Sequence, residues 1–108
     1  MTGTGYADEV NRRWEWLMTN SDALFIVVVV KAASEPRLRA LFPFRSLNEL
    51  HFSRVTEYPY DLDLPFIEIT PDGSHHARAG SGAPLLDGDL DQVVRCVAEG
   101  VLVGREGD

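Results

Sequence analysis

FIEITPDGSHHARA, residues 66–79, is the stretch that decides the fold class. Phe66, Glu68 and Thr70 alternate with two isoleucines, which is the period-two pattern of a β-strand. The Pro-Asp-Gly sequence at 71–73 favours a tight turn, because proline fixes φ and glycine accepts a positive φ. The chain should return as another strand over residues 74–79. The sequence therefore predicts an antiparallel hairpin here.

The segments on either side of this hairpin extend the sheet. In residues 47–55, Leu50 and Phe52 share one face with Arg54, while His51 and Ser53 share the other, so we expect a strand. After the hairpin, a loop at 80–84 leads to two leucines at 85–86, which should form a short packed extension of the sheet. The centre of the chain thus predicts a three-stranded antiparallel meander.

Amphipathic helices are predicted at both ends of the chain. The first should begin near Ala7, and the last should begin after Asp87 or Asp89 as its N-cap and end near Gly100. Apolar residues recur at helical spacing in both, namely Val10, Trp14 and Leu17 in the first and Val93, Val97 and Val101 in the last.

Residues 22–33, DALFIVVVVKAA, are compatible with two structures. Four successive valines have strong β propensity, and a short apolar run cannot be assigned by periodicity, so a central buried strand is one interpretation. The cap residues at 20–22 and the Lys-Ala-Ala continuation favour a helix, which is the structure we expect. A further short helix should begin at Ser34 as its cap, with Pro36 in its first turn, and should end at Pro43.

These elements predict an α+β fold with N-terminal helices, a three-stranded antiparallel meander, and a C-terminal helix packed on one sheet face. At 108 residues the chain should form a single domain over residues 1–108, with 1–5 and 104–108 frayed at its ends. The other sheet face is then left for solvent or for a partner.

The overall charge narrows the classes of partner. Ten basic and seventeen acidic side chains give a formal charge of −7, which repels nucleic acids and anionic lipid surfaces. The longest unbroken apolar run, residues 23–30, is far shorter than the roughly 20 residues of a membrane span. The first ten residues resemble no secretion signal, and the lone Cys96 cannot form an internal disulfide. We expect a cytoplasmic protein that binds neither nucleic acid nor membrane.

Residues that suggest catalysis or metal binding each have a simpler explanation. His75 and His76 are adjacent and would face opposite sides of a strand, so only one could join His51 in a metal site. The acidic run DGDLD at 87–91 departs from a calcium loop and is explained as a helix N-terminus. Cys96 should be a small buried apolar residue. We therefore expect no cofactor, no metal and no identifiable catalytic residue.

Aromatic residues and prolines gather between residues 42 and 66. Proline keeps such segments extended, and tyrosine suits a surface that is partly apolar, so this region is the candidate partner surface. The alternative is that the phenylalanines fill the core and the tyrosines cover its edge. The candidate partner-binding residues are Phe44, Arg45, His51, Arg54, Tyr58 and Tyr60.

Several segments together resemble a known family. NRRWEWLM at 11–18, LRALFPFRSLNELHFSRVTEYPY at 38–60, LPFIEITPDGSHH at 64–76 and GDLDQVVRCVAEGV at 88–101 are similar to an actinobacterial family described only as natural-product-biosynthesis proteins. The likeness covers most of the chain, and it implies a helix over residues 22–35. It implies no activity, cofactor or catalytic residue.

Two functional hypotheses follow. The first is a non-enzymatic accessory module that binds a protein or peptide, or a second copy of itself, through the aromatic segment. The second is a small enzyme of specialised metabolism that uses His51 with a nearby carboxylate, for which a concave pocket is required.

Overall fold

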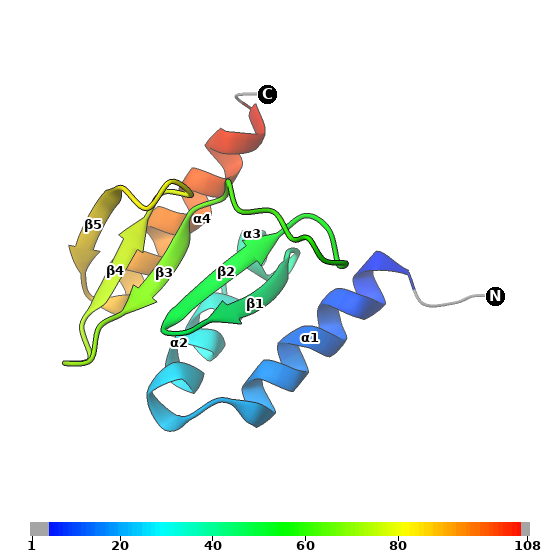
Figure 1. The fold of residues 1–108 in the computed structure, drawn as a ribbon, viewed down its shortest axis with the longest axis horizontal. Helices are drawn as coiled ribbons and strands as arrows, with labels where there is room; N and C mark the ends of the chain where they lie inside the picture. The colour runs from blue at the N-terminus through cyan, green and yellow to red at the C-terminus, as the bar shows by residue number, and fades with distance from the viewer. Residues whose placement is uncertain (1–4, 107–108) are drawn as a thin grey trace.

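The computed structural model describes residues 5–106, which form an antiparallel sheet with helices before and after it (Figure 1). The N-terminal helices are α1 (Tyr6–Asn20), α2 (Ala23–Ala33) and α3 (Pro36–Arg39). The strands are β1 (Phe42–Ser46), β2 (Glu49–Ser53), β3 (Phe66–Ile69), β4 (His75–Arg78) and β5 (Pro84–Gly88), followed by α4 (Leu90–Glu106). The α+β class predicted from the sequence is confirmed.

Within residues 5–106 the sheet has five strands, and the prediction of three was wrong. The strands pair in chain order, each antiparallel to the next. The predicted hairpin is confirmed as β3 and β4, where Phe66 pairs with Arg78 and Ile69 with His75. The two leucines at 85–86 belong to a full strand, β5, which forms one edge of the sheet.

The other missed strand, β1, contains Pro43, which the sequence predicts as the end of a helix. Pro43 pairs with Phe52 of β2, and proline is tolerated there because β1 is an edge strand that does not need every N–H for the sheet. The turn to β2 is made by Leu47 and Asn48, with Leu47 at a φ of 54°. Leucine is rarely found at positive φ, so the sequence lacks the usual glycine or asparagine signal of this turn.

The valine-rich run is helical, as expected. The Asp22 side chain caps α2 by accepting a hydrogen bond from the Phe25 N–H at 2.9 Å. The short helix α3 is confirmed, but its N-cap is Glu35, whose carboxylate accepts from the Arg37 N–H, so the prediction of Ser34 was wrong by one residue. The Ser34 hydroxyl instead donates to the Lys31 carbonyl.

The last helix begins at the second of the two predicted caps and continues beyond its predicted end. Asp89 accepts from the Gln92 N–H at 2.9 Å, and the Gln92 side chain accepts from the Asp89 N–H at 3.2 Å, which is a capping box. Gly100 does not end α4, which extends to Glu106. A Cβ on Gly100 would lie 2.8 Å from Pro65, so glycine allows the helix to approach the chain before β3.

The expected fraying of both ends is tested only in part. Gly5 precedes α1 as its N-cap, and residues 104–106 are helical. The remaining residues of both predictions, 1–4 and 107–108, lie outside the described residues.

The core lies between the sheet and the helices. In Figure 1, α2, α3 and α4 lie behind the sheet, and α1 lies beside β1. The Trp14 indole donates to the Leu41 carbonyl at 3.0 Å and its ring lies 6.2 Å from that of Phe52, which fixes α1 against the sheet. Buried side chains shared by these layers include Val10, Leu17, Phe25, Val28, Leu50, Ile67, Ala77, Val93 and Val97. No helix within residues 5–106 is long and apolar enough to cross a membrane.

Candidate functional site

Ser53, the last residue of β2, fixes the connection that follows it, residues 54–65, which we call the 54–65 loop. Ser53 is fully buried. Its hydroxyl donates to the Val55 carbonyl at 2.8 Å and accepts from the N–H groups of Val55 and Asp61, each at 3.1 Å. One side chain therefore joins the start of the loop to a residue near its end.

Arg54 provides a second attachment between the same parts of the loop. Its backbone N–H donates to Asp61 Oδ2 at 2.7 Å, and its Nε donates to the same atom at 3.1 Å. Its Nη2 donates to both carboxylate oxygens of Asp63, at 3.0 and 2.9 Å. The side-chain hydrogen bond to Asp61 is the largest cause that raises the pKa of the Arg54 guanidinium, and the one to Asp63 raises it further. The loop is thus held in one conformation by side chains at its base.

A continuous row of rings connects the loop to the sheet face that lies away from α2, α3 and α4. His51 stacks between Phe44 and Phe66, with ring centroids 5.1 and 4.2 Å apart. Tyr60, from the loop, stacks on Phe44 at 4.7 Å, and Tyr58 meets Tyr60 edge to face at 5.9 Å. Such offset and edge-on contacts are favourable, so the loop is supported by the sheet as well as by its base.

The 54–65 loop exposes three large apolar side chains. Tyr58 is 84% exposed, and Val55 and Leu62 are also exposed. Tyr58 precedes a cis proline, Pro59. Exposed large apolar side chains on an ordered loop are typical of protein contact surfaces.

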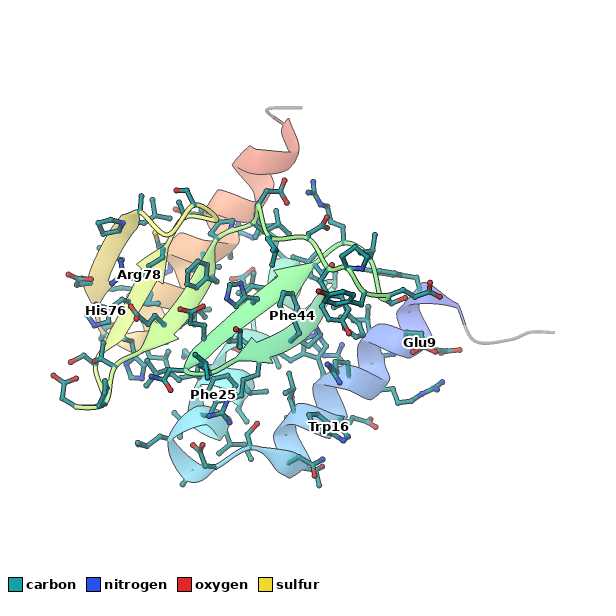
Figure 2. All side chains as sticks on the ribbon, viewed as in Figure 1. Glu9, Trp16, Phe25, Phe44, His76 and Arg78 are labelled. Atoms are coloured by element: carbon teal, nitrogen blue, oxygen red, sulfur yellow. The ribbon has the colours of Figure 1, made fainter. Side chains whose placement is uncertain are left out.

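The remainder of the same sheet face is polar. Figure 2 shows Phe44, Arg78 and His76 across this face. Arg78 Nε donates to Glu68 at 2.6 Å, and His76 Nδ1 lies 2.6 Å from Asp87. This half of the face therefore presents the Arg78–Glu68 ion pair and the His76–Asp87 contact, each between neighbouring strands.

The structure brings together five of the six candidate residues predicted from the sequence. Phe44, His51, Tyr58 and Tyr60 lie in the row of rings, and Arg54 lies at the base of the same loop. Phe44 is buried and His51 is largely covered, whereas Tyr58 is exposed, so the segment contributes to the core as well as to the surface.

Arg45 does not join this group. It reaches the helix side of the sheet, where its guanidinium contacts Asp22 at 3.1 Å and lies 4.0 Å from the Phe25 ring centroid. Sequence reasoning missed Ser53 and Leu62. Nothing in the sequence distinguishes Ser53 from other serines, because its role depends on contacts with residues 55 and 61.

His51 also has the carboxylate neighbour that an enzyme would need. Its Nε2 lies 2.8 Å from Glu49 Oε1. However, the ring is stacked on both sides by phenylalanines, and the hollows described in this structure are lined by other residues. The geometry explains the pair as a way to satisfy a partly covered imidazole within an aromatic row.

Two further observations concern metal ligands and the lone cysteine of the chain. Among the side chains that the structure describes, no group of three or more His, Cys, Asp or Glu residues is placed to hold a metal ion. Cys96 is partly covered, and burial, followed by the charge of Glu99, raises the pKa of its thiol, which disfavours the reactive thiolate.

A hollow of about 550 Å³ lies where the start of α1 meets α3 and α4. Arg54 and Arg37 contribute its charged groups, and the rest of its lining is Tyr6, Pro36, Ala40, Leu41 and Val101. Arg37 pairs with Glu35 at 3.1 Å, and the Tyr6 hydroxyl donates to the Ala40 carbonyl at 3.2 Å. Burial raises the pKa of Tyr6. These polar groups are engaged with the protein itself.

Comparison with known proteins gives one match. The model of a protein family described as "Family of unknown function (DUF6193)" matches residues 8–98, which include most of α1, the whole sheet and the first half of α4. Neither the curated proteins nor the solved structures provide a match to this chain. Because the match covers most of the sequence, the chain belongs to the DUF6193 family of unknown function.

Proposed function

We propose that the protein is a non-enzymatic module that binds a protein or peptide through the tip of the 54–65 loop. The observation that carries this proposal is the position of Tyr58. The residue is 84% exposed, yet the loop that bears it is held by Ser53 and Arg54 at its base and by Tyr60 against the sheet.

Rigidity of this kind favours binding. Association costs free energy when flexible side chains and loops become ordered, and a loop that is ordered beforehand avoids part of that cost. Tyrosine is enriched among the few interface residues that supply most of the binding free energy. Tyr58, supported edge to face by Tyr60, has the properties of such an anchor.

The charges of the loop define the chemistry of the partner. Glu57, Asp61 and Asp63 are acidic, and Arg54 is the basic residue among them. Complementary charge speeds encounter and fixes orientation. The partner proposed here therefore offers an apolar pocket or aromatic side chain for Tyr58, with lysine or arginine beside it.

The setting of this activity comes from the resemblance described above. It supports an accessory role in natural-product biosynthesis in the actinobacterial cytoplasm, where the module would hold another protein rather than transform a small molecule. This setting is part of the proposal.

A peptide-display selection tests the proposal and does not require the partner to be identified first. We expect the immobilised protein to enrich peptides that combine aromatic or aliphatic residues with basic ones. Bound peptide should shift the amide resonances of residues 54–65, and Tyr58→Ala should abolish the enrichment. Leu47→Ala is the matched control, because Leu47 is 86% exposed on the turn between β1 and β2. Enriched peptides that bind Tyr58→Ala equally well, or no enrichment at all, would refute the proposal.

A second candidate, an enzyme that uses His51 with Glu49, has the 2.8 Å contact in its favour. The rings of Phe44 and Phe66 stack on both sides of His51, and its side chain is only 12% exposed, so the binding module is the function that the geometry supports better.

A further inference from the structure

Arg13, on α1, is held in place by neutral groups. Its Nε donates to the Pro43 carbonyl of β1 at 3.3 Å. Its guanidinium carbon lies over the Trp16 ring, 5.1 Å from the ring centroid, and over the Phe42 ring at 5.2 Å. Aromatic rings attract a guanidinium without neutralising its charge. Arg13 is therefore a positioned cation.

The charge of Arg13 has no carboxylate partner among the side chains that the structure describes. The other two arginines nearby do have one, since Arg12 contacts Glu9 at 3.7 Å and Arg45 contacts Asp22 at 3.1 Å. The two terminal nitrogens of Arg13 also have no hydrogen-bond acceptor within the described part of the chain. These nitrogens carry most of the N–H donors of a guanidinium, so the donors remain available to a ligand.

Two hollows share Arg13 and Trp16 in their linings. The larger has a volume of about 460 Å³, which is within the range of small-ligand sites, roughly 300–1,000 Å³. The smaller, of about 190 Å³, lies towards the start of α1. Trp16 is 52% exposed, so it offers an apolar surface beside the available donors. The remaining lining of the larger hollow is Leu17, Asn20, Ser21, Arg45 and Leu47.

We propose that Arg13 binds the carboxylate of a ligand whose aromatic or aliphatic body packs against Trp16 in the larger hollow. Arginine recognises a carboxylate through two parallel N–H···O hydrogen bonds, and this requires a planar guanidinium at a fixed position. The contacts with Pro43, Trp16 and Phe42 supply that position before the ligand binds. A free aromatic acid and the C-terminus of a peptide that ends in an apolar residue both present this chemistry.

The local charge favours a carboxylate over a phosphate. Of the three arginines that line the two hollows, two are paired with carboxylates, which leaves the single positive charge of Arg13. A carboxylate matches one positive charge. A phosphate monoester carries about −1.5 to −2 at pH 7 and exceeds it, on a chain whose formal charge is already −7.

An NMR titration of the full chain with N-acetylphenylalanine tests the proposal. The indole N–H resonance of Trp16 should shift with a Kd of about 1 mM, as expected for a probe of this size. The indole of Trp14 should not shift, because it is buried and bonded to the Leu41 carbonyl. N-acetylphenylalaninamide has the same ring without a carboxylate and should bind about tenfold more weakly, because it cannot accept charge-assisted hydrogen bonds.

Arg13→Gln should weaken the binding of N-acetylphenylalanine about tenfold and leave that of the amide unchanged. Arg95→Gln is the matched control, because it removes the same charge at an exposed arginine on α4 that lines neither hollow. It should bind as the wild type does, and circular dichroism should show that both variants are folded. The comparison of acid and amide on the wild type does not depend on either variant.

A short peptide with a C-terminal phenylalanine distinguishes the two sources of the carboxylate. Tighter binding than that of N-acetylphenylalanine identifies a peptide terminus as the ligand, and weaker binding identifies a free aromatic acid. Inorganic phosphate should displace neither. The proposal would be overturned if acid and amide shifted the Trp16 resonance equally, if neither shifted it, if phosphate displaced the acid, or if Arg13→Gln bound the acid as the wild type does.

Discussion

Replacing Ser53 by alanine should destabilise the protein by about 2–4 kcal/mol. The Ser53 hydroxyl makes three hydrogen bonds to backbone groups, and the side chain is fully buried. Each such hydrogen bond contributes about 1 kcal/mol net, and a buried group left without a partner costs about 1–3 kcal/mol. The alanine variant leaves the N–H groups of Val55 and Asp61 and the Val55 carbonyl without this partner, and water at the loop surface compensates in part.

Urea unfolding with a fluorescence readout measures the change, and Ser46→Ala is the matched control because Ser46 is exposed on β1. At about 4 °C per kcal/mol for a chain of this size, Ser53→Ala should lower the Tm by roughly 8–16 °C. Hydrogen exchange should accelerate mainly in residues 54–63. A loss of stability below about 0.5 kcal/mol, or exchange in the loop equal to that of the wild type, would refute the role assigned to Ser53.

Two further predictions concern caps and turns. Asp89→Ala removes the carboxylate of the α4 capping box and should cost about 1 kcal/mol in urea unfolding. Asp87→Ala, which leaves that cap intact, should cost less, and equal losses would contradict the assignment of the cap. The pKa of Asp72 is lowered to about 2, and the largest cause is the hydrogen bond that its carboxylate accepts from the Thr70 hydroxyl. Because the folded-state pKa lies below the usual value, the stabilisation from Asp72 is present above about pH 4 and is lost as pH falls towards 2. In Thr70→Val an NMR titration should show a higher pKa for Asp72, and an unchanged pKa would disprove the link.

The helices were the most predictable part of the fold. For α2 the deciding signal was local, because Asp22 caps the helix through the Phe25 N–H, and a cap can be recognised from sequence even where valine propensity favours a strand. A cap signal of the same kind predicted that α4 begins after Asp87 or Asp89. The glycine signal at Gly100 was misleading, because α4 continues to Glu106 and a Cβ on Gly100 would lie 2.8 Å from Pro65, which is distant in sequence.

The strand β1 could not be predicted for a physical reason. Proline is normally unfavourable within a strand, yet Pro43 lies in β1. Leucine is normally unfavourable at positive φ, yet Leu47 has a positive φ. Both are accommodated by the register with β2 and by the Arg45 Nε, which donates to the Leu47 carbonyl at 2.7 Å. The pairing of β1 with β2 cannot be read from either residue by itself.

The candidate site was predictable as a region but not as a surface. Composition identified the aromatic segment, and Tyr58 and Tyr60 do meet there. Which ring is exposed depends on the 54–65 loop, since Tyr60 lies back on Phe44 while Tyr58 points outward. The exposed side of α2, formed by Leu24, Val27 and Val30, was visible in the sequence only as part of an unbroken apolar run, and such a run does not show which side remains uncovered.

The affinity of a display-selected peptide for the wild type, Tyr58→Ala and Leu47→Ala tests the central claim most directly. An anchor residue contributes at least about 2 kcal/mol, so Tyr58→Ala should weaken binding by about 30-fold or more in isothermal titration calorimetry. Leu47→Ala should bind as the wild type does. Equal affinity of Tyr58→Ala and the wild type would contradict the claim that the 54–65 loop is the docking surface.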